Sequence, residues 1–145
     1  MIAVDYGTRR TGFAVADPLR IVVQPLDVCT APGDGEELLA HVAGLLRERD
    51  VATVLVGLPL QMDGREGDRA ADVRRFVARL RECFPTLEVL TWDERLSTKE
   101  AEDRLREAGL HGAERRARTD SWSARVVLED WIRAGEPRPG ARDDA

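Results

Sequence analysis

The chain has 145 residues, of which 43% are hydrophobic and 34% are charged, and its formal net charge is −5. This length fits one domain of ordinary size and excludes a second full domain beside it. The acidic balance argues against a surface that binds nucleic acid everywhere. No run of about 18 apolar residues and no basic segment before a cleavable apolar one is present, so the sequence predicts a soluble, cytoplasmic protein without membrane contact.

The basic residues are almost all arginines, because Lys99 is the only lysine among the 22. The planar guanidinium group suits phosphate oxygens, so pairs such as Arg9 and Arg10 could form local phosphate contacts on an acidic protein. Cys29 and Cys83 lie far apart without metal-ligand spacing, and both are expected to be buried or half-buried thiols.

Three short apolar segments open the chain, at residues 2–6, 12–16 and 21–28. Their brevity and close spacing predict an antiparallel meander. The first segment runs into Asp5 and a glycine-bearing turn. Burying a carboxylate is costly unless a cation or hydrogen bonds satisfy it, so Asp5 is the first candidate for chemistry.

The middle of the chain alternates helix and strand signals. Apolar residues at helical spacing follow the loop at 32–35 and predict a helix that ends near Asp50. The continuous β-branched run at 51–56 is typical of a central strand covered on both faces. After a loop over 57–67, a second helix ends at Pro85, and residues 87–91 are predicted to form a fifth strand.

The last third is predicted to be helical. Ser97 and Glu100 have the spacing of a capping box, which predicts a helix that ends at Gly109. Residues 110–118 are expected to form a loop, 119–134 a final helix, and 135–145 a disordered tail. The element order predicts an α/β fold in a single domain over residues 1–134. Its mixed five-stranded sheet has three antiparallel strands, then two crossover strands, with helices on both faces.

Further acids stand where the predicted fold brings them toward Asp5. Asp93 and Glu94 come at the carboxyl end of the fifth strand, and Asp120 opens the inward stripe of the last helix. That stripe consists of Ala124, Val127, Leu128 and Trp131. Alone, Asp120 is more simply a helix cap or a charge that complements the helix dipole. Three converging acids repel unless cations neutralise them, which indicates Mg²⁺ or Mn²⁺, as two ions, in a metal-dependent nuclease.

Four ordered blocks resemble the signature of the YqgF/RuvX family. They lie at residues 5–12, 56–64, 93–101 and 120–121, the last followed by the apolar helix. The resemblance implies a bacterial ribonuclease-H-like nuclease. The family is described as a Holliday junction resolvase and as a nuclease implicated in maturing the 5′ end of pre-16S rRNA. The resemblance also implies that Asp5, Glu94 and Asp120 are the catalytic, metal-binding acids.

Contacts to nucleic acid are predicted from basic and polar residues around these acids. The choices for phosphate contacts are Arg9, Arg10, Arg95 and Lys99, and Gln61 and Arg65 are the choices for a wall formed by the loop after the fourth strand. The first block departs from the family's usual pattern at Thr11, where isoleucine is common, and Trp122 replaces a smaller aliphatic residue.

The position of the second acid poses a geometric question. In many ribonuclease-H-like nucleases this acid follows the fourth strand, but here the next acid after that strand is Asp63. If the fifth strand lies beyond the fourth, Glu94 must span about two strand spacings, roughly 10 Å. A glutamate on a loop after the strand can do this. Asp63 is the weaker candidate and is expected to shape its turn with Gly64, while Asp93 could assist the site.

Two alternatives and one question stay open. The opening motif also occurs in sugar kinases and actin-like ATPases, which need two such domains where 145 residues supply one. A nucleic-acid-binding or scaffold module of the same fold would need no acids, whereas this chain retains all three. The sequence does not decide between a structured RNA precursor and branched DNA. Symmetric cutting of a four-way junction would call for a homodimer.

Overall fold

The computed structural model describes residues 1–94 and 113–138, with side chains described for 1–94 and 121–138. Five strands form one sheet in the order β3-β2-β1-β4-β5. They are β1 (Ile2–Asp5), β2 (Gly12–Ala16), β3 (Val23–Pro25), β4 (Thr53–Leu58) and β5 (Glu88–Asp93). The first three strands are antiparallel, and β1, β4 and β5 are parallel. The predicted mixed five-stranded sheet is confirmed.

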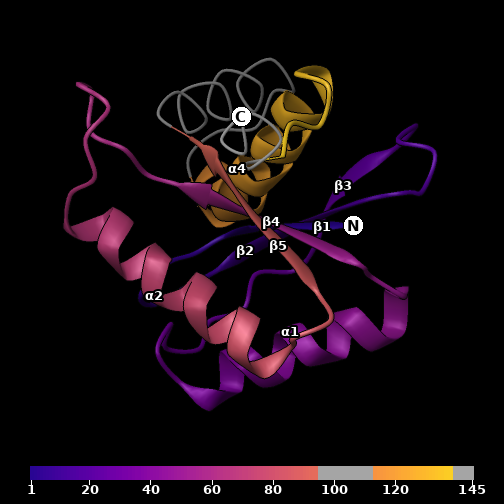
Figure 1. The fold of residues 1–145 in the computed structure, drawn as a ribbon, viewed down its shortest axis with the longest axis horizontal. Coiled ribbons are helices and arrows are strands. Elements are labelled where there is room, and N and C mark those ends of the chain that lie inside the picture. Colours follow the sequence, from indigo (N-terminus) through magenta and orange to yellow (C-terminus); the bar gives the residue numbers. More distant parts are fainter. Residues whose placement is uncertain (95–112, 139–145) are drawn as a thin grey trace.

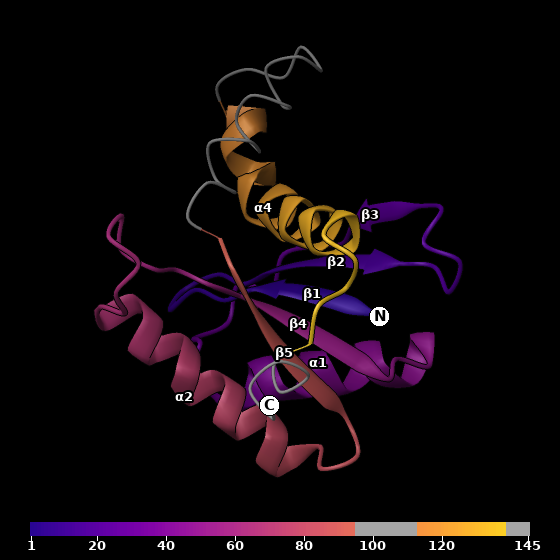
Figure 2. The same ribbon diagram turned by 45° about the horizontal axis from the view of Figure 1, so that its top comes forward.

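Helices cover both faces of this sheet. Helices α1 (Glu36–Arg49) and α2 (Asp68–Cys83) lie on one face, and α4 (Ala113–Arg133) lies on the other (Figures 1 and 2). Successive side chains of a strand point to opposite faces. Accordingly Val54 and Val56 pack in the cluster under α1 and α2, whereas Leu55 packs under α4. None of the described helices is long and apolar enough to cross a membrane.

Strand β4 lies at the centre of the parallel part, between β1 and β5. Val54, Leu55 and Val56 are fully buried, which confirms the prediction from their continuous apolar run. The strand is displaced by two residues from the predicted range and extends to Leu58, so Gly57 belongs to the strand and the expectation of a loop there was wrong. Strand β5 likewise continues to Asp93, and Glu94 follows it directly.

Helix α4 begins earlier than the sequence predicts. Residues 113–118 were expected to form part of a loop, but α4 starts at Ala113. Alanine, glutamate and arginine favour helix without supplying an apolar stripe, so periodicity does not reveal this part. Figure 2 shows these first turns extending beyond the sheet. From Ala124 onward the predicted stripe is fully buried; the helix predicted from Ser97 lies outside the described residues.

Two smaller expectations were wrong. Strand β3 covers only Val23–Pro25 of the predicted range 21–28. The Asp17 carboxylate accepts a 2.7 Å hydrogen bond from Val22 N, which holds the preceding residues in a turn, and Pro25 cannot donate to a ladder. Cys83 is exposed at the last position of α2, while Cys29 is half-buried as expected.

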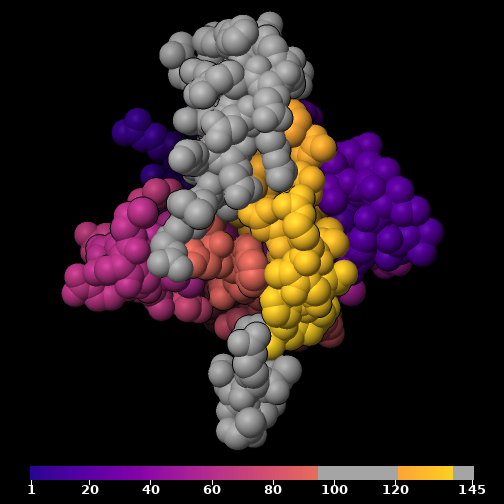
Figure 3. Space-filling model, turned by 90° about the horizontal axis from the view of Figure 1, so that it is seen from above, coloured from indigo at the N-terminus to yellow at the C-terminus, as the bar shows by residue number. Residues whose placement is uncertain are grey.

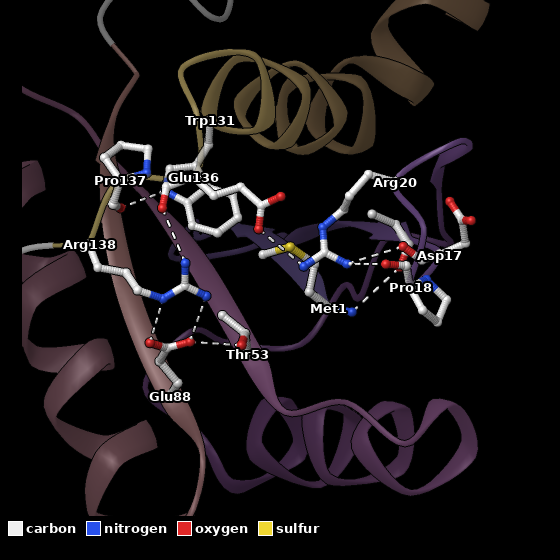
Figure 4. A network of polar contacts seen from close by, with 11 residues as sticks. Met1, Asp17, Pro18, Arg20, Thr53, Glu88, Trp131, Glu136, Pro137 and Arg138 are labelled. Atoms are coloured by element: carbon white, nitrogen blue, oxygen red, sulfur yellow. Dashed lines mark hydrogen bonds and ion pairs between the residues drawn. The ribbon is translucent and has the colours of Figure 1, made fainter.

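The residues after α4 close the end of the sheet where β4 and β5 begin (Figure 4). Trp131 Nε1 donates a 2.9 Å hydrogen bond to Pro137 O. Arg138 donates two hydrogen bonds, of 2.9 and 3.2 Å, to the Glu88 carboxylate. Structural contacts therefore occupy this end of the sheet, and the carboxyl ends of β1, β4 and β5 lie at the opposite one.

Candidate active site

The carboxyl groups of Asp5 and Glu94 meet at the carboxyl edge of the parallel strands. Asp5 is the last residue of β1, and Glu94 is the first residue after β5. Glu94 N donates a 3.1 Å hydrogen bond to Leu58 O, which fixes the backbone of Glu94 beside the end of β4. A side-chain hydrogen bond joins Glu94 to Asp5. Glu94 therefore spans β4, the intervening strand.

Gly57 makes this crossing possible. A Cβ atom at Gly57 would overlap Oε2 of Glu94 and lie 3.0 Å from its Cδ. Atoms do not approach one another this closely, so the Glu94 carboxyl can keep its observed position above β4 only while residue 57 is glycine. The requirement explains a glycine inside a central strand, where it otherwise weakens packing.

The electrostatic environment favours a proton on Glu94. Burial raises the pKa of the Glu94 carboxyl to about 7, and the charge of Asp93 acts in the same direction. The Arg69 guanidinium and the hydrogen bond with Asp5 lower this pKa and only partly offset burial. A hydrogen bond between two carboxyl groups needs one proton, so Asp5 and Glu94 share a proton when they are joined in this way.

A closed turn follows Asp5 and presents the predicted arginines. A Cβ atom at Gly7 would overlap Arg10 O, so the turn is too tight for another residue there. Buried Thr11 stabilises it, since its hydroxyl accepts from Gly7 N and donates to Gly7 O, both at 3.4 Å. Arg9 and Arg10 are exposed on this turn, within five residues of Asp5 in the sequence.

Helix α4 carries Asp120 across the same region of the sheet. It contacts β1, β2, β3 and β4, and Figure 3 shows it lying between the β2–β3 side and β5. Val127 Cγ2 lies 3.4 Å from the Cβ position of Gly57. Asp120 stands seven residues earlier, about 10 Å along the helix axis. The side chain of Asp120 lies outside the described part of the structure, as do Arg95 and Lys99.

Within the described side chains, the site contains two acids, Asp5 and Glu94. Among the described residues no group of three or more histidine, cysteine, aspartate or glutamate residues is arranged to hold a metal ion. Asp5 and Glu94 are thus the described members of the predicted set of three.

The loop after β4 is a compact turn. Asp63 Oδ1 accepts a 3.0 Å hydrogen bond from Arg65 N, and Oδ2 pairs with Arg65 Nε at 2.6 Å. Gly64 has a positive φ of 88°, and Gln61 N donates to Arg65 O at 2.8 Å. Asp63 therefore shapes its turn as expected. Within the described residues, the hydrogen bonds of Gln61 N and of the Arg65 side chain are made inside this turn and not to the acid pair.

Arg69 is a residue that the sequence interpretation missed. It is the second residue of α2, and its charge acts on Glu94. With Tyr6, Thr8 and Pro59 it lines a hollow of about 310 Å³ beside the turn that follows Asp5. Arg69 could have been found from its position in the sequence, because a helix that follows β4 and its loop begins near the carboxyl edge of the sheet.

Comparison with known proteins shows the family of the chain. The family model RuvX, described as a Holliday junction resolvase, matches residues 1–134. The chain belongs to the RuvX family. A relative from Anaeromyxobacter sp. (strain Fw109-5) is 43% identical over 131 residues, covering 90% of this chain and 94% of the relative, and is named "Putative pre-16S rRNA nuclease". A relative of the same name from Acetivibrio thermocellus is 33% identical over 132 residues, covering 91% and 94% of the two chains.

Solved structures place this RuvX-family chain in a known fold. Thermus thermophilus RuvC superposes with a TM-score of 0.57 at 13% identity, covering 96% of this chain and 99% of RuvC. The Fowlpox virus resolvase, solved with its substrate Holliday junction DNA, gives 0.54 at 11% identity, covering 94% and 100%. These identities support the fold alone. The predicted family and the ribonuclease-H-like fold are confirmed.

Proposed function

We propose that this RuvX-family protein is a metal-dependent nuclease that hydrolyses phosphodiester bonds of nucleic acid. The observation that carries the proposal is the half-buried pair of Asp5 and Glu94 carboxyl groups, joined across Gly57 at the carboxyl edge of the sheet. Asp120 is the third acid of the proposed site. The nuclease names of the relatives support the same reaction class.

The donor set fits Mg²⁺ or Mn²⁺. Carboxylate oxygens are hard ligands of the kind that both ions prefer. Burial of Glu94 disfavours its negative charge, so a divalent cation would stabilise the ionised form. Asp5, Glu94 and Asp120 would hold such ions, as two ions in the complete site. The ions would supply an activated water and stabilise the leaving oxygen.

The chain's own residues supply position and charge. Asp5 is anchored by the ladder of β1, and the hydrogen bond of Glu94 N to Leu58 O anchors the other carboxyl. Gly57 keeps the space between them open. Arg9 and Arg10, on the turn after Asp5, are the proposed contacts to backbone phosphates, together with Gln61, Arg65, Arg95 and Lys99.

Two substrates are consistent with the relatives. The name pre-16S rRNA nuclease indicates a structured RNA precursor, whereas Holliday junction DNA is the substrate in the Fowlpox virus complex. Symmetric cutting of a four-way junction needs a two-fold dimer, whereas trimming of an RNA end does not. The oligomeric state on each substrate therefore belongs to the same test.

The test is a cleavage assay with the purified chain, on a labelled four-way DNA junction and on a structured RNA precursor. Cleavage should require Mg²⁺ or Mn²⁺ and should be lost in Asp5→Asn, while folding and binding are kept. Glu48→Gln, an exposed change in α1, is the matched control. Metal-dependent turnover by Asp5→Asn would refute the assignment. Absence of cutting by the wild type on both substrates, with metal bound, would favour a binding module.

A further inference from the structure

A groove runs from the candidate active site along α2. The hollow of about 310 Å³ that Arg69 lines adjoins a second of about 400 Å³, and the two share Tyr6, Thr8 and Asp72 in their walls. Both volumes lie at the lower end of the range for small-ligand sites, so each fits a unit of about nucleotide size. We call this feature the α2 groove, defined by Tyr6, Thr8, Arg69, Asp72, Arg75 and Arg79.

One wall of the α2 groove carries a row of arginines. Arg69, Arg75 and Arg79 lie along about 15 Å of the helix, since ten residues separate the first from the last. Arg75 pairs with Asp72, and Arg79 donates a 2.7 Å hydrogen bond to Asp34 O. Asp34 and Asp72 are the acids in these walls, so the described lining has more positive than negative side chains.

Arg69 differs from the other two arginines. Among the described residues, Arg69 has an electrostatic interaction with Glu94, whereas Arg75 and Arg79 pair with acids beside them. The Arg69 side chain is exposed and lines the hollow beside Pro59. The Arg69 guanidinium therefore lies where its charge acts on Glu94 and where a ligand in the hollow could contact it.

The α2 groove also has an aromatic part, the half-buried ring of Tyr6, which packs against the core. Tyr6 directly follows Asp5, and its ring stacks on Phe76 of α2 with centroids 4.5 Å apart. A Cβ atom at Gly33 would lie 2.5 Å from the Tyr6 hydroxyl, so glycine is needed for the ring to occupy this position. Basic side chains that follow a backbone are an element of single-strand binding grooves, and Tyr6 adds an aromatic edge to the lining of this one.

We propose that the α2 groove binds the single-stranded sugar-phosphate backbone next to the cut phosphate. Arg69 contacts the phosphate nearest to Asp5 and Glu94, and Arg75 and Arg79 lie along the strand beyond it. The two hollows, of about 310 and 400 Å³, match single nucleotides in size, which favours one strand over a duplex. The proposal rests on the nuclease function and adds the path of its substrate.

The experiment measures binding of the full chain to a fluorescent single strand, as RNA and as DNA, and to the matching duplex, over a series of salt concentrations with EDTA present. Arg69→Ala should weaken single-strand binding about tenfold. It should also reduce the slope of log K against log salt by about 0.7, the value for one lost phosphate contact on a single strand. Arg69→Lys should recover part of the affinity because it keeps the charge.

Two controls make the outcome specific. Arg47→Ala removes the same charge from the distant end of α1, and we expect single-strand affinity close to wild type. A strand with a neutral methylphosphonate beside the cut position should bind the wild type more weakly than the unmodified strand does. Arg69→Ala should bind both strands equally. The strand that binds with the higher affinity, RNA or DNA, is the one that the α2 groove prefers.

The outcomes separate this inference from the nuclease proposal. If the wild type cleaves but Arg69→Ala binds strands as Arg47→Ala does, the α2 groove is wrong and the nuclease function stands. If Arg69→Ala weakens binding to the duplex as much as binding to the single strand, the groove is not a single-strand path. If the wild type cleaves neither substrate, but Arg69→Ala binds the single strand more weakly than the wild type does, the groove stands and the nuclease function fails.

Discussion

Substitution of Gly57 by alanine tests how Glu94 reaches Asp5. The new methyl group would overlap Oε2 of Glu94 and lie 3.0 Å from Cδ. Because carbon atoms pack at about 3.5 Å or more, the carboxyl must move by about 1 Å. A displacement of that size in a reacting group costs about 100-fold in rate, equivalent to about 2.7 kcal/mol of activation free energy.

The same substitution should leave the fold nearly unchanged. Its next neighbour, Val127 Cγ2, lies 3.4 Å from the new Cβ, which is an ordinary contact. Alanine in a strand interior is favoured over glycine by up to about 1 kcal/mol, which offsets the local adjustment. We therefore expect a free energy of unfolding in urea within about 1 kcal/mol of wild type.

Gly44→Ala is the matched control. A Cβ atom at Gly44 has no neighbour within 4 Å, so this change in α1 should stabilise the fold by about 1 kcal/mol and leave cleavage unchanged. Both variants are compared with wild type by the rate of cleavage of a labelled substrate at saturating metal. A folded Gly57→Ala protein that cleaves at the wild-type rate would refute the reasoning, because Glu94 would then not need the space above Gly57.

The remaining predictions concern pH and the C-terminal contacts. Folded Glu94 keeps its proton to about pH 7, whereas the ordinary pKa is 4.5, so the folded state binds more protons between these values. The free energy of unfolding should therefore fall as pH rises from 5 to 7.5 in metal-free buffer, by on the order of 2 kcal/mol, and Glu94→Gln should remove this slope in urea titrations. An unchanged slope in Glu94→Gln would contradict the pKa. Trp131→Phe removes the buried hydrogen bond to Pro137 O and should lower the free energy of unfolding by about 1–3 kcal/mol, whereas Arg138→Ala, which breaks a half-exposed pair with Glu88, should cost less than about 1 kcal/mol. The reverse order in thermal unfolding would mean that Arg138 holds this segment.

Periodicity was sufficient for the elements that bury a regular apolar face. The run at Val54 to Val56 identified a central strand, and the stripe from Ala124 to Trp131 identified the inward face of α4, because both patterns follow directly from burial. The start of α4 at Ala113 could not be found this way, since a helical segment without an apolar stripe resembles a polar loop in sequence.

The site was only partly predictable for a different reason. The acids Asp5 and Glu94 could be named because they end apolar strands, but the strand order alone left a gap between them. Gly57 closes that gap through the absence of a side chain, and the interpretation of Gly57 as a loop residue concealed this. Arg69 is separated from Asp5 in the sequence by β2, β3, α1 and β4, so only the packing of α2 against the turn after Asp5 shows that they are neighbours.

The most direct test of the account is cleavage by Asp5→Asn, Glu94→Gln and the double variant under identical metal conditions. If the two carboxyl groups form one site, each single variant should lose more than about 100-fold in rate, and the double variant should lose little more than either, because residues that act as a unit are not additive. Circular dichroism verifies that all three remain folded. Retained cleavage in either single variant, or losses that multiply in the double variant, would contradict a shared Asp5–Glu94 site.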